Sequence, residues 1–141
     1  MTAVDTNILV YAHVETMPQH PAARARLVAL AEGDPLWGIP VFCLGEFLRV
    51  VTHARLFNPP YTVDAACLAL DRLLESPSVR ILYPGGRYWP LLAEALREAD
   101  ASGNLVFDAQ IVAVCRETGV SAFLTADRDF DRFLAFRVER L

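Results

Sequence analysis

Apolar residues along this chain change their spacing in a regular way, from short continuous runs to runs with a helical period and back again. The short runs have the length of buried strands. Prolines at Pro40 and Pro84 close two of these runs. We predict strands at residues 2–4, 36–39, 79–83, 121–124 and 136–139.

The segments between these strands carry apolar residues at intervals of three and four, the spacing of a helix that packs on a core. Local signals mark several ends. Pro21 suits the first position of a helix, and Gly119 is a residue that ends one in a left-handed conformation. Thr62 and Asn104 are residue types that cap helix N-termini. We predict helices at residues 8–14, 21–31, 41–55, 63–75, 86–101 and 105–118, with a short helical turn at 128–134.

Strands that alternate with helices in one chain predict a parallel α/β sandwich with right-handed crossovers. No repeat, low-complexity segment or linker divides the sequence, so we predict a single domain over residues 1–141. Its expected fold is a five-stranded parallel sheet flanked by helices on both faces. In such sheets, reactive side chains gather at the carboxyl ends of strands, where the strand order reverses.

Composition narrows the class of protein. Of the 141 residues, 54% are apolar and 21% are charged, which excludes a disordered chain and leaves apolar surface for a protein partner. No run reaches the roughly 18 apolar residues of a membrane span. The N-terminus also lacks the basic segment of a signal peptide. We therefore expect a soluble, cytoplasmic protein that does not enter a membrane.

Charged and reactive residues exclude several kinds of chemistry. All 13 basic residues are arginine, and the missing lysine rules out P-loop phosphate binding and Schiff-base catalysis. The net charge of −4 gives no overall attraction to nucleic acid, so binding of that kind depends on local arginines and a metal. Cys43, Cys67 and Cys115 lie far apart among apolar residues, and we expect buried free thiols.

Four acidic residues fall where the functional site of such a fold lies. Asp5 and Asp127 follow the first and fourth predicted strands, so each lies at a strand's carboxyl end. Glu46 and Asp108 lie on predicted helices and have apolar neighbours three and four positions away. We therefore expect these two side chains to point toward the core.

Carboxylates crowded together inside a protein are unfavourable, because each loses hydration and each repels the others. A divalent cation among them removes both costs. A ligand set made only of oxygens favours Mg²⁺ or Mn²⁺ over Zn²⁺. Such an ion polarises a phosphodiester and lowers the pKa of a bound water. The sequence therefore predicts a site for a divalent cation.

Each acid also has a purely structural interpretation. Asp5 could cap the helix that follows it. Glu46 could pair with Arg49 one turn later. Asp108 could serve only the dipole of its helix.

A run of three alternating acids, Asp127, Asp129 and Asp131, has the spacing of a calcium loop. Arg132 stands where that loop needs glycine, so we reject a calcium site. We interpret Asp129 and Asp131 as solvated turn residues or as partners of the adjacent arginines.

At these acidic positions the sequence resembles the PIN-domain family, and within it the VapC toxins of bacterial toxin–antitoxin pairs. The matching segments are VDTNILVYA, GEFLRVVT, GNLVFDA and LTADRDF, in the family's order along nearly the whole chain. The resemblance implies an endoribonuclease that depends on Mg²⁺ or Mn²⁺. It also implies inhibition by a VapB-type antitoxin and assembly as a homodimer or a higher oligomer.

The resemblance also implies a set of site residues. The acidic quartet is Asp5, Glu46, Asp108 and Asp127, with Asp5 and Asp108 as the principal metal ligands. The small polar residues that accompany the acids in the family correspond to Thr6, Asn7 and Thr125. One departure is Gln110, where close relatives often carry histidine.

From these residues we form the hypothesis that the protein hydrolyses RNA phosphodiester bonds. Asp5 and Asp108 hold the ion, and Asp127 joins them directly or through water. Glu46 orients or deprotonates the attacking water, or binds a second ion. Arg87, next to two glycines, is a candidate for binding the substrate phosphate.

Two other classes stay open at this stage. One is a non-catalytic α/β module that binds a protein or RNA. The other is a phosphatase with an aspartyl nucleophile, although Asn7 stands where that chemistry usually has a second acid.

Overall fold

The computed structural model describes all residues from Met1 to Leu141. Its sheet has five parallel strands in the order β3-β2-β1-β4-β5. The strands are β1 (Thr2–Val4), β2 (Trp37–Pro40), β3 (Val79–Leu82), β4 (Ala122–Leu124) and β5 (Val138–Glu139). The helices are α1 (Thr6–His13), α2 (His20–Glu32), α3 (Val41–Val51), α4 (Val63–Leu74), α5 (Tyr88–Glu98) and α6 (Leu105–Glu117), with a 3₁₀ helix η1 (Arg128–Arg132).

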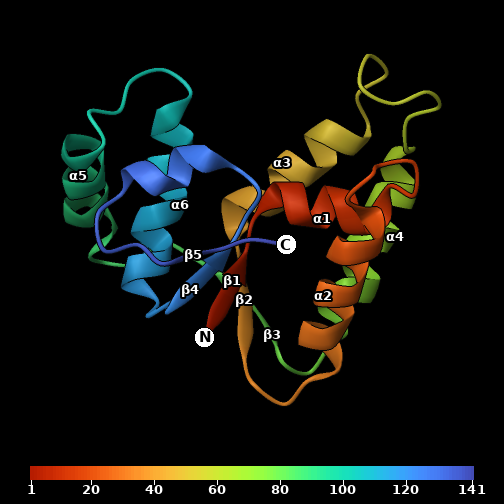
Figure 1. The fold of residues 1–141 in the computed structure, drawn as a ribbon, viewed down its shortest axis with the longest axis horizontal. Coiled ribbons are helices and arrows are strands. Elements are labelled where there is room, and N and C mark those ends of the chain that lie inside the picture. The colour runs from red at the N-terminus through yellow and green to blue at the C-terminus, as the bar shows by residue number, and fades with distance from the viewer.

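The sheet lies between two helical layers (Figure 1), with α5 and α6 on one face and α1, α2 and α4 on the other. The chain passes from β1 outward to β2 and β3, crosses to the opposite face through α5 and α6, and returns beside β1 as β4. The strand order therefore reverses between β1 and β4. Val4 pairs with Leu124, so Asp5 and Thr125 follow at the same level of the sheet.

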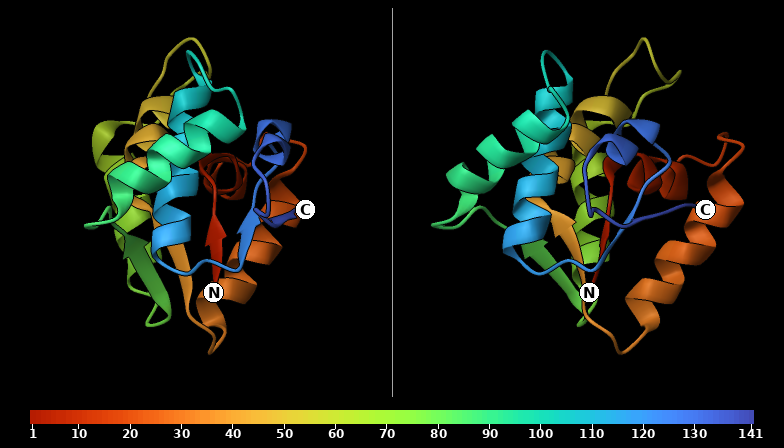
Figure 2. Two further views of the ribbon diagram at one scale, coloured as in Figure 1. Left: turned by 90° about the vertical axis from the view of Figure 1, so that its left-hand side faces the viewer. Right: turned by 60° about the vertical axis from the view of Figure 1, so that its left-hand side comes forward.

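Buried apolar side chains fill the space between the layers. Ala3, Val4, Phe123 and Leu124 on the two central strands have no exposed surface. Helix α6 is buried on most of its circumference, since the sheet covers one side of it and α5 packs on another (Figure 2). The fold thus holds α6, and the acidic residue near its N-terminus, in a fixed position above the sheet.

The predicted α/β fold with five parallel strands is confirmed, and so are two of the local signals. The hydroxyl of Thr62 accepts a hydrogen bond from the Ala65 backbone N–H at 3.1 Å, as an N-cap does. Gly119 has φ +74°, the left-handed conformation that ends a helix. No helix of the structure combines the length and apolar character needed to cross a membrane.

Helix α3 ends earlier than predicted, at Val51 instead of residue 55. The hydroxyl of Thr52 donates to the Leu48 carbonyl at 2.6 Å, and the Val51 carbonyl accepts from the Tyr61 N–H at 2.8 Å. These bonds turn the chain back. The predicted cap at Asn104 is also wrong, because this residue has helical dihedral angles and its side chain makes no capping bond.

The thiol prediction is correct for two cysteines of three. All three are free, and Cys43 and Cys115 are buried, but Cys67 is exposed. Helix α4 buries Ala66 and Leu70 against the core. Cys67 is one position from Ala66, about 100° around the helix, and therefore faces solvent.

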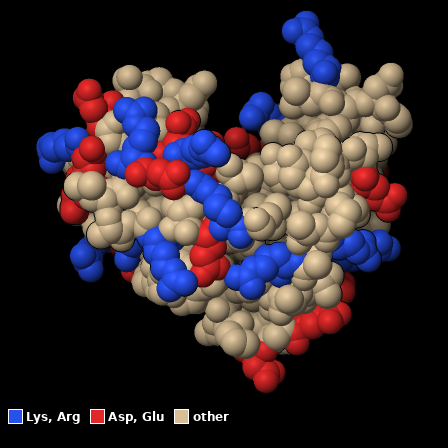
Figure 3. Space-filling view, viewed as in Figure 1, with Lys and Arg blue, Asp and Glu red and all other residues tan.

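Charged side chains of both signs are mixed over the face seen in Figure 3. Arginines lie next to acidic residues over much of it, and no broad basic surface forms there. This agrees with the net charge of −4. Any contact with an anionic partner on this face thus depends on single arginines.

Candidate active site

A pocket of about 440 Å³ opens at the switch point between β1 and β4. Its lining contains all four of the predicted acids, although they come from four separate elements or loops. The residues that line it are Asp5, Thr6, Asn7, Val10, Tyr11, Met17, Glu46, Val50, Leu56, Phe57, Asp108 and Asp127. The structure therefore brings the predicted quartet to one place.

Asp5 lies at the back of this pocket and is 4% exposed. It is the N-cap of α1, and its Oδ1 accepts a hydrogen bond from the Thr6 N–H at 2.7 Å. The pKa of Asp5 is raised from 3.8 to about 6, mainly by burial. The nearby charges of Glu46 and Asp127 also raise it, whereas the hydrogen bonds from Thr125 and Thr6 lower it. The capping interpretation is thus correct, and it coexists with a carboxylate placed in the site.

A network of small polar side chains fixes Asp5 across the switch point. Its Oδ2 accepts hydrogen bonds from Asn7 Nδ2 at 2.7 Å and from the Thr125 hydroxyl at 2.5 Å. The same hydroxyl accepts from Asn7 Nδ2 at 3.1 Å and from the Asp127 N–H at 2.9 Å. Asn7 Oδ1 in turn accepts from the Ala126 N–H at 3.0 Å. These bonds tie the end of β1 to the end of β4.

Glu46 lies at the rim of the pocket, not on the core side of α3 as predicted. Its side chain is 44% exposed. The core face of this helix consists of Cys43, Phe47 and Val51, and Glu46 is about 100° around the helix from Phe47. Its Oε2 accepts from the Thr6 hydroxyl at 3.0 Å, and its Oε1 lies 3.6 Å from an Arg49 nitrogen. The side chains of Glu46 and Arg49 are 44% and 63% exposed, so water screens the ion pair between them.

Asp108 is half-buried in the first turn of α6, and its carboxylate forms no hydrogen bond or ion pair with the protein. Burial raises its pKa from 3.8 to about 7, and the charges of Asp127, Asp5, Asp129 and Glu46 act in the same direction. An unpaired carboxyl group at this place is unfavourable for the protein alone. It is what a cation site requires.

Asp129 is the acidic residue that the sequence reasoning missed. Carboxylate oxygens of Asp108, Asp127 and Asp129 all lie within 4.8 Å of one another. Asp127 Oδ1 accepts from the Asp129 N–H at 2.9 Å, and this turn brings the second acid to the same side as the first. The alternating D-x-D spacing after a predicted strand was the available signal. The predicted arginine partners are also wrong, because Asp131 pairs with Arg140 at 2.7 Å.

The donors of this cluster fit a hard divalent cation. Its members supply only carboxylate oxygens, and no arginine pairs with Asp5, Asp108, Asp127 or Asp129. The Cys43 sulfur lies 4.0 Å from Asp5 Oδ1, but burial and the Asp5 charge raise the pKa of that thiol, which stays protonated. The set therefore suits Mg²⁺ or Mn²⁺ better than a metal that prefers sulfur.

Arg87 is not part of this site. Its backbone N–H donates to Glu117 Oε1 at 2.7 Å, and the Gly85 N–H donates to Oε2 of the same carboxylate at 2.7 Å. Glu117 ends α6, nine residues beyond Asp108, a distance of roughly 13 Å along a helix. Arg87 is thus held near the opposite end of α6.

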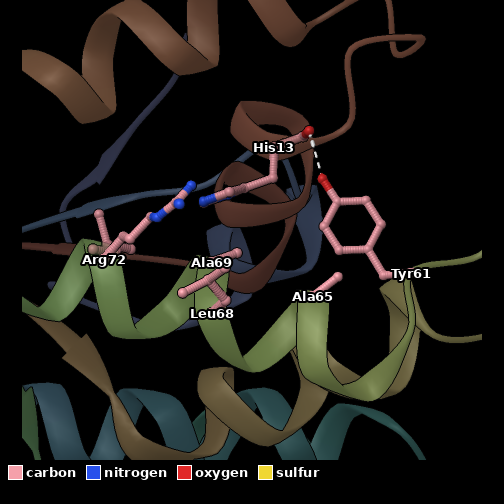
Figure 4. A pocket seen from close by; sticks show the side chains of 7 residues that line it. His13, Tyr61, Ala65, Leu68, Ala69 and Arg72 are labelled. Atoms are coloured by element: carbon pink, nitrogen blue, oxygen red, sulfur yellow. Dashed lines mark hydrogen bonds between the residues drawn. The ribbon is translucent and has the colours of Figure 1, made fainter.

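A second cavity, of about 450 Å³, lies between the end of α1 and α4 (Figure 4). His13 and Arg72 point toward one another across it, and the Tyr61 hydroxyl donates to the His13 carbonyl at 2.8 Å. Its floor on α4 is apolar, and it holds no acidic residue. The lining residues are His13, Tyr61, Ala65, Leu68, Ala69, Arg72 and Leu73.

Together, the fold and the site define a class of protein: a parallel α/β domain with a carboxylate pocket at its switch point. Residues 2–134 match the PIN domain family. The chain is 39% identical over 137 residues to the VapC ribonuclease Mb2897 of Mycobacterium bovis, an alignment that covers 97% of this chain and 92% of the relative. It is 30% identical to ribonuclease VapC48 of Mycobacterium tuberculosis, over 95% and 92% of the two chains. The chain therefore belongs to the PIN domain family, among its VapC ribonucleases.

Solved structures agree on the fold. VapBC2 from Rickettsia felis, bound to a DNA fragment from its promoter, superposes with a TM-score of 0.73 at 19% identity and covers 99% of this chain and 98% of the other. VapC20 from Mycobacterium tuberculosis, a toxin that cleaves the sarcin-ricin loop, superposes with a TM-score of 0.70 at 23% identity, over 97% and 99%. The predicted resemblance is confirmed.

Proposed function

We propose that this VapC ribonuclease hydrolyses RNA phosphodiester bonds with a divalent cation held in the pocket at the switch point. The observation that carries the proposal is the set of carboxylates of Asp108, Asp127 and Asp129, grouped within 4.8 Å and paired with no arginine. Such a group is repulsive in the absence of an ion. The curated relatives at 30% identity or more, which are named ribonucleases, support the same function.

We assign the ion to Asp5, Asp108 and Asp127, with Asp129 as a further carboxylate. Asp5 Oδ2 already accepts two short hydrogen bonds, whereas Oδ1 accepts only the Thr6 N–H at such a distance, so Oδ1 is the oxygen available to a cation. Mg²⁺ and Mn²⁺ are the ions that these donors suit. When bound, the ion would polarise the scissile phosphodiester and make a bound water more acidic.

The remaining site residues act on water and on the carboxylates. We assign to Glu46, which accepts a hydrogen bond from Thr6 at the pocket rim, the roles of orienting the attacking water and accepting its proton. Asn7 and Thr125 hold Asp5 in one orientation through the bonds described above, so its carboxylate does not rotate away from the site. The sequence-based roles of these residues stay predictions until they are tested.

We further propose a VapB-type antitoxin as the protein partner. The solved neighbour from Rickettsia felis is a VapBC complex. The cavity in Figure 4 offers apolar residues of α4 flanked by Arg72 and His13, which suits an amphipathic segment with an acidic side chain. The three free thiols are typical of a reducing compartment, in line with the expected cytoplasmic location. The homodimer implied by the resemblance stays a prediction.

Cleavage of labelled RNA by the purified protein tests this function. We expect cuts with Mg²⁺ or Mn²⁺ and none with EDTA. The Asp108→Asn variant should lose activity by roughly 100-fold or more, since it removes a charge that holds the ion. Asp64→Asn is the matched control, because Asp64 also lies in the first turn of a helix but does not line the pocket.

Two results would contradict the proposal. Equal cleavage by Asp108→Asn and the unmodified protein would show that the cluster is not the active site. A protein with no cleavage, and with no thermal stabilisation by Mn²⁺ beyond that given by a matched inert salt, would be the non-catalytic module considered above.

A further inference from the structure

The guanidinium of Arg140, one residue before the C-terminus, contacts the acidic loop after β4 at three points. Nη1 donates to the Thr125 carbonyl at 3.0 Å and to the Asp127 carbonyl at 2.9 Å. Nη2 donates to Asp131 Oδ1 at 2.7 Å. One side chain thus spans the loop from Thr125, its first residue, to Asp131, the fourth of the five residues of η1.

This loop carries two of the grouped carboxylates, those of Asp127 and Asp129. The N–H groups of Asp127 and Asp129 bond within the loop, to the Thr125 hydroxyl and to the Asp127 carboxylate. Both carry negative charge beside Asp108, and this repulsion favours movement of the loop away from α6. A positive group that holds the loop backbone opposes that movement.

Strand β5 fixes Arg140 itself. The Phe123 N–H donates to the Arg137 carbonyl at 2.9 Å, and the Thr125 N–H donates to the Glu139 carbonyl at 3.1 Å. Glu139 also pairs with Arg26 on α2 at 2.9 Å, and Figure 2 shows the C-terminal end beside that helix. These contacts lie beyond residue 134, where the match to the PIN domain family ends.

We propose that Arg140 is a positioning residue of the metal site, acting through the backbone of the loop from Thr125 to Asp131. Its planar guanidinium presents several N–H donors in a fixed fork, which suits three acceptors at once, and lysine cannot reproduce this. By pairing with Asp131 it also keeps that acid away from the cluster, so that Asp127 and Asp129 are the two that face Asp108. The inference rests on the proposed metal site.

The test compares Arg140→Gln with Arg137→Gln. Arg137 directly precedes β5 as Arg140 directly follows it, carries the same charge, is 72% exposed and pairs only with Glu139, so it is a matched control. In EDTA, hydrogen exchange of the loop amides of Asp127 and Asp129 should become faster in Arg140→Gln and stay unchanged in Arg137→Gln. Mn²⁺ affinity measured by calorimetry without RNA should fall roughly 10-fold in Arg140→Gln, the size of effect that supporting residues have at metal sites.

The Arg140→Lys variant separates charge from geometry. It retains the positive charge, so we expect Mn²⁺ affinity to stay several-fold below that of the unmodified protein, because one ammonium cannot replace the three bonds. Affinity equal to that of the unmodified protein in both Arg140 variants, or exchange rates that do not change, would overturn the inference. If the unmodified protein itself binds no Mn²⁺ and cuts no RNA, the proposed function fails first, and the exchange result alone then decides whether Arg140 holds the loop.

Discussion

Replacing Asp108 with asparagine should stabilise the metal-free protein while it removes activity. The carboxylate of Asp108 accepts no hydrogen bond from the protein, so the isosteric amide loses no contact. It loses only a negative charge among those of Asp5, Asp127 and Asp129. A residue that weakens the fold but serves a ligand should show this pattern.

The size of the effect follows from the raised pKa. A rise from 3.8 to about 7 corresponds in full to roughly 4 kcal/mol. Because the side chain is half-exposed, solvent screens much of this, and we expect ~1–2 kcal/mol. The folded protein binds the proton of the Asp108 carboxyl group more tightly than the unfolded chain does. The contribution of this group to the free energy of unfolding is therefore fully present below the unfolded pKa of 3.8 and is lost as the pH rises through about 7. The gain in the free energy of unfolding that Asp108→Asn gives over the unmodified protein should therefore be small near pH 4 and reach its full size near pH 8.

Thermal unfolding followed by circular dichroism in EDTA measures the difference at both pH values. At pH 8 the midpoint of Asp108→Asn should lie roughly 3–8 °C above that of the unmodified protein. Addition of Mn²⁺ should reverse the order, since only the unmodified protein binds the ion tightly. A lower midpoint for the variant at pH 8 in EDTA would refute the view that the carboxylate cluster is repulsive.

Three further outcomes are expected. Thr125→Val removes the hydroxyl that binds Asp5 and should lower the free energy of unfolding in urea by roughly 2–3 kcal/mol. Thr125→Ser keeps a hydroxyl at this position and should retain most of the stability of the unmodified protein. Gly38→Ala would place a methyl group 2.7 Å from a Leu82 carbon and should cost ~1–3 kcal/mol in the same assay, while Gly45→Ala meets open space and should not destabilise the protein. For the unmodified protein, Mn²⁺ at about 100 times its Kd should add about 2.7 kcal/mol of stability, and a midpoint that does not depend on Mn²⁺ concentration would contradict a metal site.

The sequence was sufficient to predict the strands, the layers and the position of Asp5 and Asp127 at the carboxyl ends of strands. These features follow from the length of each apolar run and from the spacing of apolar residues in the segments between the runs. The end of α3 was not accessible in this way. It depends on a bond between Val51 and Tyr61, ten residues apart, that forms only when the chain folds back. Local propensity had no information on that contact.

Some residues of the candidate site could likewise be predicted from local sequence patterns, and others could not. Asp108 was found because an acid among apolar helical neighbours is unusual, and the same reasoning failed for Glu46, which lies beside the buried stripe of α3 and not within it. Asp129 was missed because its placement depends on the turn that Asp127 caps. Arg140 requires the pairing of β4 with β5, which no local pattern of the sequence describes.

The acidic pocket joins the first residues of the chain to the last ones, since Asp5 bonds to Thr125 and Arg140 holds the adjacent loop. A ribosome makes the N-terminal end first, at roughly 5–20 residues per second. Asp5 is thus synthesised 120 positions before Thr125, the residue whose hydroxyl fixes its carboxylate. We therefore expect the acidic pocket to form only after the segment from Thr125 to Arg140 has been made.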